Sequence, residues 1–237
     1  MNMYRDAMVE AVSRLVAIPS VLETDDRTPF GPQVDRCLDE ALAILSELGL
    51  HTYKSPDGMY GYAEIGEGEL FGVLCHLDVV QARQEDGWNY PPFVPTVQDN
   101  CLYGRGTQDD KGPTIAAAFA LKSLLDDQIP LRKRVRFILG IDEETLWHSI
   151  RAYSQREEAP ASGFVPDSAF PLTYAEKGLL QVHIRSAESF PFSCRGGDTL
   201  NAVSSFACCP DKDVLRLALN ELGLPWHQKG DELCVEG

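Results

Sequence analysis

The strongest constraint in this sequence is the order of its apolar runs, which alternate with helical patterns and are followed by acidic residues. The run Leu70–Cys75 is almost wholly apolar, as expected for a parallel strand that is buried on both faces. Arg134–Ile141 has the same character, and a helical pattern over residues 112–125 separates the two runs. This alternation predicts an α/β fold with a mixed, largely parallel sheet flanked by helices.

The other predicted elements divide the chain into two domains, 1–178 and 179–237. In the first, helices are expected at residues 3–17, 34–48 and 145–155, and shorter strands at His51–Lys54, Met59–Ile65, Thr96–Tyr103 and Gly163–Val165. In the second, strands are expected at Gln181–Arg185, Asn201–Phe206 and Glu232–Val235, with a helix at Asp211–Leu222. The second domain is therefore predicted to be a small α+β unit, with no partner strand following the last predicted strand.

Composition limits the classes of partner. The 237 residues are 44% hydrophobic, which is enough for a substantial core. A formal net charge of −15 argues against a nucleic-acid partner, since phosphate binding needs a basic surface. No run reaches the roughly 18 apolar residues of a membrane span, and the N-terminal residues lack the apolar centre of a signal peptide. We therefore expect a soluble, cytoplasmic protein without a membrane partner.

The cysteine pattern predicts reduced thiols. There are seven cysteines, an odd number, and none forms a C-x-x-C pair. Cys208 and Cys209 are adjacent, which suits neither a zinc knuckle nor an ordinary disulfide framework. In a cytoplasmic protein, thiols are usually kept reduced.

His76-Leu77-Asp78 follows the first buried strand and is a candidate for metal binding. Side chains two apart in a strand face the same side, so His76 and Asp78 can lie together. A metal-bound imidazole usually donates its other N–H to a carboxylate, a role that fits Asp78. The alternative is a core histidine with a satisfied hydrogen bond. The acidic residues that follow the other strands favour the metal site.

The segment Gly104–Pro113 contains the second candidate, Asp109. Its glycines permit a tight loop that brings Asp109 to the start of the next helix, where a carboxylate can bridge two cations. The segment is not a dinucleotide fingerprint, because Asp109 stands where the third glycine would be. An ordinary acidic residue at a helix N-terminus is the alternative, and it suits Asp110 better than Asp109.

Three more carboxylates follow predicted strands. Glu143 and Glu144 come after Arg134–Ile141, and Asp167 follows Gly163–Val165. Adjacent glutamates in one site repel unless cations neutralise them, so one can bind metal while its neighbour acts as a general base. Alternatively, they form an exposed helix start, and Asp167 an ordinary turn. Open α/β sheets bind ligands at the carboxyl ends of their strands, and oxygen and imidazole donors suit zinc or manganese.

Taken in order, these motifs resemble the dinuclear-zinc metallopeptidases that include aminoacylases, carnosinases and bacterial dipeptidases, with the greatest likeness to the dipeptidase V type. The matching segments are Leu15–Val21, His76–Val80, Gly87-Trp88, Pro92-Phe93, Gly104–Pro113, Asp142–Thr145, Pro166-Asp167, Phe170-Pro171 and Glu176–Gly178. The resemblance implies a zinc-peptidase catalytic domain in residues 1–178, followed by the start of an α+β lid domain.

The resemblance also implies roles. His76 and Asp167 would bind one metal, Glu144 the other, and Asp109 would bridge them. Asp78 would orient His76, and Glu143 would move the proton of the attacking water. The expected cofactors are two divalent ions, zinc or else manganese or cobalt, and the expected substrate is a dipeptide or short peptide.

The chain departs from such relatives in length. Relatives of this type are roughly twice as long, and two histidines that they use would follow residue 237. We therefore expect this chain to be a fragment or truncated product with little or no activity alone. The alternatives are an amidohydrolase of N-acyl amino acids or N-succinyl diamino acids, which would use the same centre, and a non-catalytic metal-binding remnant.

Overall fold

The computed structural model describes every residue except 1, 24, 179, 181–192, 198–205 and 237. The chain divides into two compact units, Met1–Tyr174 and Ala175–Gly237. This division lies close to the domain boundary predicted at residue 178. The interpretation of the second unit as part of a lid domain stays a prediction. The predicted strand Gln181–Arg185 lies outside the described residues, as does Asn201–Phe206 apart from Phe206.

The first unit is built on a five-stranded mixed sheet in the order β1-β2-β6-β3-β7. Its strands are β1 (His51–Lys54), β2 (Gly61–Ile65), β3 (Leu70–His76), β6 (Arg134–Gly140) and β7 (Ser162–Phe164). The β1·β2 and β2·β6 pairs are antiparallel, whereas β3 pairs in parallel with both β6 and β7. The carboxyl ends of β6, β3 and β7 therefore meet at one edge of the sheet.

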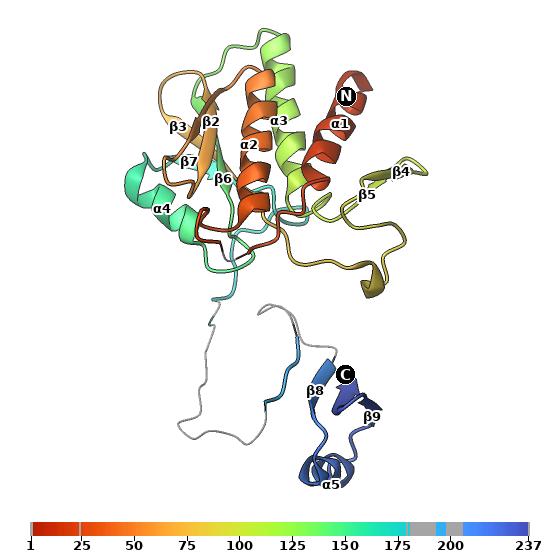
Figure 1. The fold of residues 1–237 in the computed structure, drawn as a ribbon. Coiled ribbons are helices and arrows are strands. Elements are labelled where there is room, and N and C mark those ends of the chain that lie inside the picture. Colours follow the sequence, from red (N-terminus) through yellow and green to blue (C-terminus); the bar gives the residue numbers. More distant parts are fainter. Residues whose placement is uncertain (1, 24, 179, 181–192, 198–205, 237) are drawn as a thin grey trace. The chain divides into compact units, whose positions relative to one another are not determined.

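Helices cover both faces of this sheet (Figure 1). On one face lie α1 (Arg5–Val16), α2 (Pro32–Glu47) and α3 (Lys111–Asp126), and α4 (His148–Arg156) lies on the other. The core between α1, α2, α3 and the sheet contains Leu15, Leu38, Ile115, Phe137 and Leu139, all almost fully buried. A smaller cluster joins α4 to the sheet's other face. Such burial on both faces explains the nearly continuous apolar sequence of β3 and β6.

The segment predicted as one strand, Thr96–Tyr103, is instead a hairpin. It forms the antiparallel strands β4 (Thr96–Gln98) and β5 (Cys101–Tyr103). The two residues between them, Asp99 and Asn100, have φ values of 50° and 63°. Aspartate and asparagine tolerate this left-handed conformation better than most residues, so a two-residue turn interrupts the expected strand.

The fourth helix begins three residues later than predicted, at His148 rather than Thr145. Trp147 has a φ of 58°, which interrupts the helical conformation just before the first turn. The buried Asp142 carboxylate accepts hydrogen bonds from the backbone N–H groups of His148 and Ser149, at 2.6 and 2.8 Å. Asp142 therefore stabilises the start of α4, as side-chain acceptors commonly do at a helix N-terminus.

The second unit contains a three-stranded antiparallel sheet, β8-β10-β9, and one helix. Its elements are β8 (Phe206–Pro210), α5 (Asp213–Glu221), β9 (Trp226–Lys229) and β10 (Glu232–Glu236). The first unit also contains two 3-10 turns, η1 (Asn2–Tyr4) and η2 (Gln84–Asp86). The last predicted strand corresponds to β10, which is the central strand and pairs with β8 and β9, both of which precede it in the sequence.

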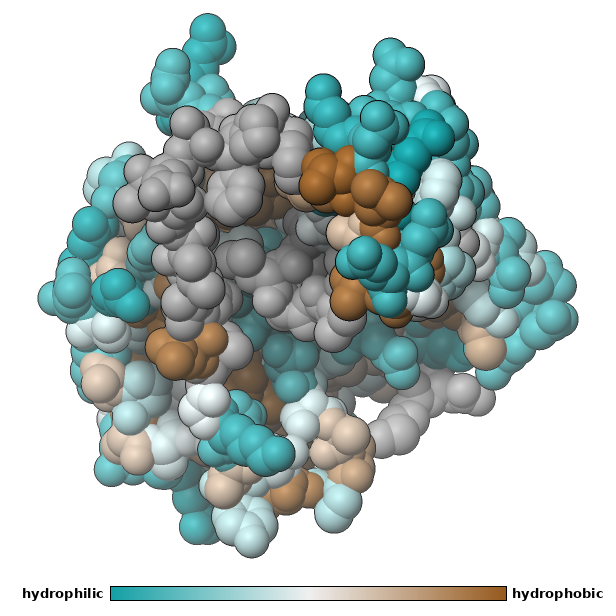
Figure 2. Space-filling view, turned by 90° about the horizontal axis from the view of Figure 1, so that it is seen from below, coloured by the Kyte–Doolittle hydropathy of each residue, from teal (hydrophilic) through white to brown (hydrophobic). Residues whose placement is uncertain are grey.

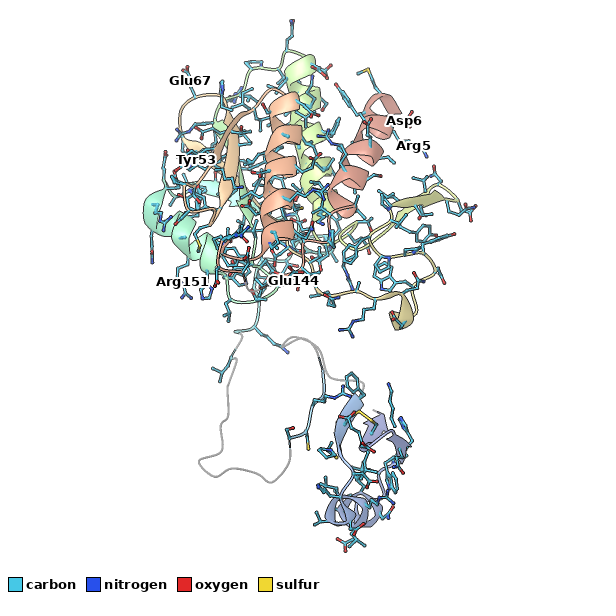
Figure 3. The ribbon with its side chains drawn as sticks, viewed as in Figure 1. Arg5, Asp6, Tyr53, Glu67, Glu144 and Arg151 are labelled. Carbon is cyan, nitrogen blue, oxygen red and sulfur yellow. A yellow bond between two sulfur atoms is a disulfide. The ribbon has the colours of Figure 1, made fainter. Side chains whose placement is uncertain are left out.

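The expectation that all the cysteines are reduced is also wrong, because Cys208 and Cys234 form a disulfide (Figure 3). These two residues face each other across the β8·β10 pair. Neighbouring residues in a strand face opposite sides, so Cys209 points away from the bond that its neighbour makes. The interpretation from sequence considered only the adjacent pair and the compartment, and neither of these reveals the strand register.

The surface agrees with the acidic, polar composition. On the face drawn in Figure 2, the described residues are mainly hydrophilic, and the hydrophobic ones form small separate groups. Among the described residues, none of the helices has the length and apolar character needed to cross a membrane.

Candidate metal centre

The imidazole of His76, at the end of β3, lies at the centre of the candidate site. Its side chain is buried, and its Nε2 atom lies 2.8 Å from Oδ1 of Asp109 and 3.5 Å from Oδ2 of Asp167. Its Nδ1 atom lies 2.9 Å from the backbone carbonyl oxygen of Asp78. A proton on Nδ1 can donate to that carbonyl, which leaves the Nε2 lone pair facing the two carboxylates.

The carboxylates around His76 stabilise the protonated, positively charged form of its ring. Burial disfavours the imidazolium ion, but hydrogen bonds to Asp109, Asp167 and Asp78 outweigh burial and raise the pKa of His76 above its usual value. The hydrogen bond to His76 in turn lowers the pKa of Asp109. One imidazole nitrogen and two carboxylate oxygens, from His76, Asp109 and Asp167, lie within 4.8 Å of one another. This donor set fits a divalent cation, which would supply the positive charge directly.

Asp109 is held in place by the two residues that follow it. Asp110 is fully buried, and its Oδ2 atom accepts the backbone N–H of His76 at 3.2 Å and the hydroxyl of Thr114 at 3.2 Å. Burial raises the pKa of Asp110 to about 7. Lys111 is also buried, and its Nζ atom donates to the carbonyl oxygens of Leu15 and Ile18, each at 2.9 Å. These bonds connect the start of α3 to β3 and to the residues around the end of α1.

Asp78 connects His76 to the segment that carries the two glutamates. Its Oδ1 and Oδ2 atoms accept the backbone N–H groups of Glu143 and Glu144, at 3.1 and 3.0 Å. The same carboxylate approaches Nδ1 of His76 at 3.5 Å, farther than the Asp78 carbonyl oxygen. The buried Asp78 carboxylate is therefore placed to fix the loop after β6, while its carbonyl oxygen is placed to orient the ring.

Glu143 and Glu144 are half-buried beside this cluster. Burial raises the pKa of Glu143 to about 7, and the negative charges of Glu144 and Asp167 add to the effect. A carboxyl group with such a pKa can exchange a proton near neutral pH. Glu144 lies at the end of the first unit where the carboxyl ends of the parallel strands meet (Figure 3). Its carboxylate does not belong to the three-residue group described above.

The structure thus brings His76, Asp109 and Asp167 together and places Asp78 and Glu143 next to them. It also shows buried hydrogen bonds, made by Asp110 and Lys111, that the sequence did not indicate. An acidic residue at a helix start is common, and nothing in the local sequence shows that its side chain is buried. His148, one helical turn past Glu144 in the sequence, has a half-exposed side chain whose Nδ1 atom lies 3.6 Å from Oδ2 of Asp142.

We expect Asp78→Asn to weaken divalent metal binding by about tenfold to a hundredfold, the range found for partners that hold metal ligands. The amide would place an NH₂ group opposite one of the backbone N–H groups of Glu143 and Glu144, which now donate to the carboxylate. Zinc titration by isothermal calorimetry measures the change. Asp57→Asn, at an exposed position on the same unit, is the control, and equal affinities for all three proteins would contradict the role of Asp78.

A cavity of about 910 Å³ borders the site on the side of the Gly104–Asp109 loop. Its lining includes Asp109, Trp88 and Tyr103. The guanidinium of Arg105 stacks over the ring of Trp88, 5.1 Å from its centre. The cavity has the size of a small-molecule site, and polar and aromatic groups surround it.

Comparisons with known proteins identify a family and relatives of this chain. The model of the family described as Peptidase family M20/M25/M40 matches residues 72–208. The chain is 42% identical over 180 residues to the "Putative dipeptidase SH1171" of Staphylococcus haemolyticus, covering 74% of this chain and 38% of that protein. It is 45% identical over 157 residues to the "Putative dipeptidase YtjP" of Bacillus subtilis, covering 66% and 33%. The chain therefore spans well under half the length of these relatives.

Solved structures show the same fold. The human carnosine dipeptidase 1 structure matches with a TM-score of 0.60 at 24% identity, over 71% of this chain and 40% of that one. The metallo-carboxypeptidase Sso-CP2 of Sulfolobus solfataricus matches with a TM-score of 0.55 at 24% identity, over 68% and 37%. These matches confirm the predicted mixed sheet with parallel strands between helices.

Proposed function

Since this chain belongs to the peptidase family M20/M25/M40, we propose that its centre hydrolyses dipeptides or short peptides with the help of divalent metal ions. The observation that carries the proposal is the group of His76, Asp109 and Asp167, whose donor atoms lie within 4.8 Å of one another. The relatives that are named dipeptidases support the choice of substrate class. The cavity beside Asp109 supports a substrate of this size.

The residues divide between two metal positions. His76 and Asp167 would hold one ion, Glu144 would hold the other, and Asp109 would bridge them with its two carboxylate oxygens. The negative charge that raises the pKa of His76 supports this assignment, because the same charge attracts cations. Zinc suits the donors best, and manganese or cobalt would also suit them. When bound, such ions supply Lewis acidity and lower the pKa of a water molecule.

The protein groups around the ions would handle protons and position. Glu143 would accept the proton of the attacking water and pass it to the leaving amine, a role supported by its half-buried carboxyl with a pKa of about 7. Asp78 would keep Glu143 and Glu144 beside His76 through its two backbone hydrogen bonds. The buried contacts of Asp110 would keep Asp109 opposite the imidazole.

We expect Glu143→Gln to lower the rate of peptide hydrolysis by about a hundredfold to ten-thousandfold, the usual contribution of a positioned general base. The amide keeps the size of the side chain but cannot accept the proton of water. Amino acid release, measured by mass spectrometry, gives the rate, and elemental analysis gives the metal content. Glu10→Gln, at an exposed position of α1, is a control for a general effect of lost charge. An unchanged rate for Glu143→Gln would show that Glu143 is not the general base.

A panel of dipeptides and N-acyl amino acids tests the function. Metal-dependent release from dipeptides, lost in His76→Ala, supports the proposal. Release from N-acyl or N-succinyl substrates alone would favour the amidohydrolase alternative. Metal binding without release from any substrate is the result expected both for a chain with little activity by itself and for a non-catalytic metal-binding protein. The low activity expected for the chain by itself stays a prediction, and the same panel measures it.

A further inference from the structure

The sheet of the second unit has one face that carries two cysteines and a glutamate, away from its helix. Cys208 of β8 lies opposite Cys234 of β10. Side chains of α5 form hydrogen bonds with Trp226 and Gln228 of β9. These two residues flank the β9 residue that is paired with Cys234, so their side chains face away from the side of the sheet that carries Cys234. The described helix of this unit therefore lies on the face opposite the two cysteines.

Three metal-ligating groups meet on this face. Glu232 is two residues before Cys234 in β10, so both side chains point to the same side. The sulfur atoms of Cys208 and Cys234 and a carboxylate oxygen of Glu232 lie within 4.8 Å of one another. Both cysteines are buried, with 5% and 2% of their surface exposed, whereas Glu232 is partly exposed. The group thus combines two sheltered sulfur donors with a carboxylate that solvent can reach.

Arg195 orients the carboxylate of this group. Its Nη2 atom lies 2.6 Å from Oε2 of Glu232, and its Nε atom lies 3.2 Å from Oε1. Its backbone exchanges two hydrogen bonds with Cys208, at 2.8 and 2.7 Å, which keeps the guanidinium on the same face. A carboxylate has about four lone-pair sites, so Glu232 can keep this partner and still bind a cation. Metal-ligating carboxylates are commonly held by such hydrogen bonds.

We propose that, when the Cys208–Cys234 disulfide is reduced, Cys208, Cys234 and Glu232 form a second metal site that takes a thiophilic divalent cation such as zinc. The proposal concerns the second unit and is independent of peptide hydrolysis. A dithiol reductant converts the disulfide to two thiols and is itself oxidised to a disulfide. Binding of the cation then displaces one proton from each thiol. Thiolate ligands select zinc over calcium or magnesium.

Cobalt(II) is the probe that tests this site in the full chain. Thiolate-bound cobalt has a strong near-ultraviolet charge-transfer absorption, which imidazole and carboxylate ligands do not produce. The cluster of His76, Asp109 and Asp167 contains no sulfur ligand, so cobalt bound there does not contribute. We expect the band in the reduced chain, its absence in the oxidised chain, and its loss when zinc is added in excess over all the proposed metal positions. A reduced chain without the band would overturn the proposal.

Substitutions identify the residues that bind the cobalt and so produce the band. Cys208→Ser and Cys234→Ser are expected to abolish it, and Glu232→Gln is expected to weaken cobalt binding by about tenfold or more. Cys209→Ser is the matched control, because Cys209 neighbours Cys208 in the same strand but faces the other side. The band should persist in Cys209→Ser. A band that survives in Cys208→Ser and Cys234→Ser would assign it to other thiols and overturn the proposal. Far-ultraviolet circular dichroism confirms that each variant folds. Glu232→Gln changes a partly exposed residue, so it tests the site without altering the buried Cys208 and Cys234.

Discussion

His76→Ala is expected to weaken binding of divalent zinc in the first unit by about a hundredfold or more. Changing a residue that only supports a metal ligand already costs tenfold to a hundredfold, and His76 supplies the central donor itself. Its Nε2 atom is the one that lies near both Asp109 and Asp167. Without the imidazole, the carboxylates of Asp109 and Asp167 remain, and they lack a nitrogen donor between them.

The measurement is a competitive zinc titration with a chromophoric chelator. His148→Ala is the matched control, because it removes an imidazole whose side chain is half exposed on α4. We expect His148→Ala to bind zinc as the unchanged protein does. The oxidised chain is used throughout, so that the thiols of Cys208 and Cys234 do not contribute. Equal zinc affinity in His76→Ala and the unchanged protein would show that the metal binds elsewhere.

Phe137→Ala is expected to lower the free energy of unfolding by about 3 to 5 kcal/mol, the range for removing a large buried aromatic side chain. Phe137 has 1% of its surface exposed and lies in β6, between Ala63 of β2 and Val73 of β3. It belongs to the core that α1, α2 and α3 form with the sheet. Because β6 also leads into Glu143 and Glu144, a cavity here would loosen the segment that carries them.

Urea denaturation followed by circular dichroism measures this change through the shift of the midpoint. Phe170→Ala is the control, since that ring is 97% exposed and its loss should change stability by less than about 0.5 kcal/mol. A loss of under 1 kcal/mol for Phe137→Ala would contradict the packing described for the centre of the sheet.

The elements that sequence predicted well are those with strong local signals. β3 and β6 are buried on both faces, and their unbroken apolar runs indicate this directly. The cluster of His76, Asp109 and Asp167 followed from the rule that ligands gather at the carboxyl ends of parallel strands. The neighbouring parallel strands β3 and β7 bring His76 and Asp167 together, and the loop before α3 adds Asp109, although no two of the three residues are close in sequence.

The features that sequence did not predict depend on contacts between distant segments. The central position of β10 and the Cys208–Cys234 disulfide follow from the register with β8, which no local pattern specifies. The late start of α4 depends on the Asp142 carboxylate reaching forward to two backbone N–H groups. The buried contacts of Asp110 and Lys111 depend on how α3 packs beside β3 and near the end of α1.

The most direct test of the central claim is a crystal structure of the protein grown with zinc, with anomalous data collected on both sides of the zinc absorption edge. The account predicts an anomalous peak about 2 Å from Nε2 of His76 and within bonding distance of carboxylate oxygens of Asp109 and Asp167. A second peak, between Asp109 and Glu144, would complete the two-metal assignment. An ordered His76 that keeps its direct bond to Asp109, with no peak between them at saturating zinc, would contradict the metal centre.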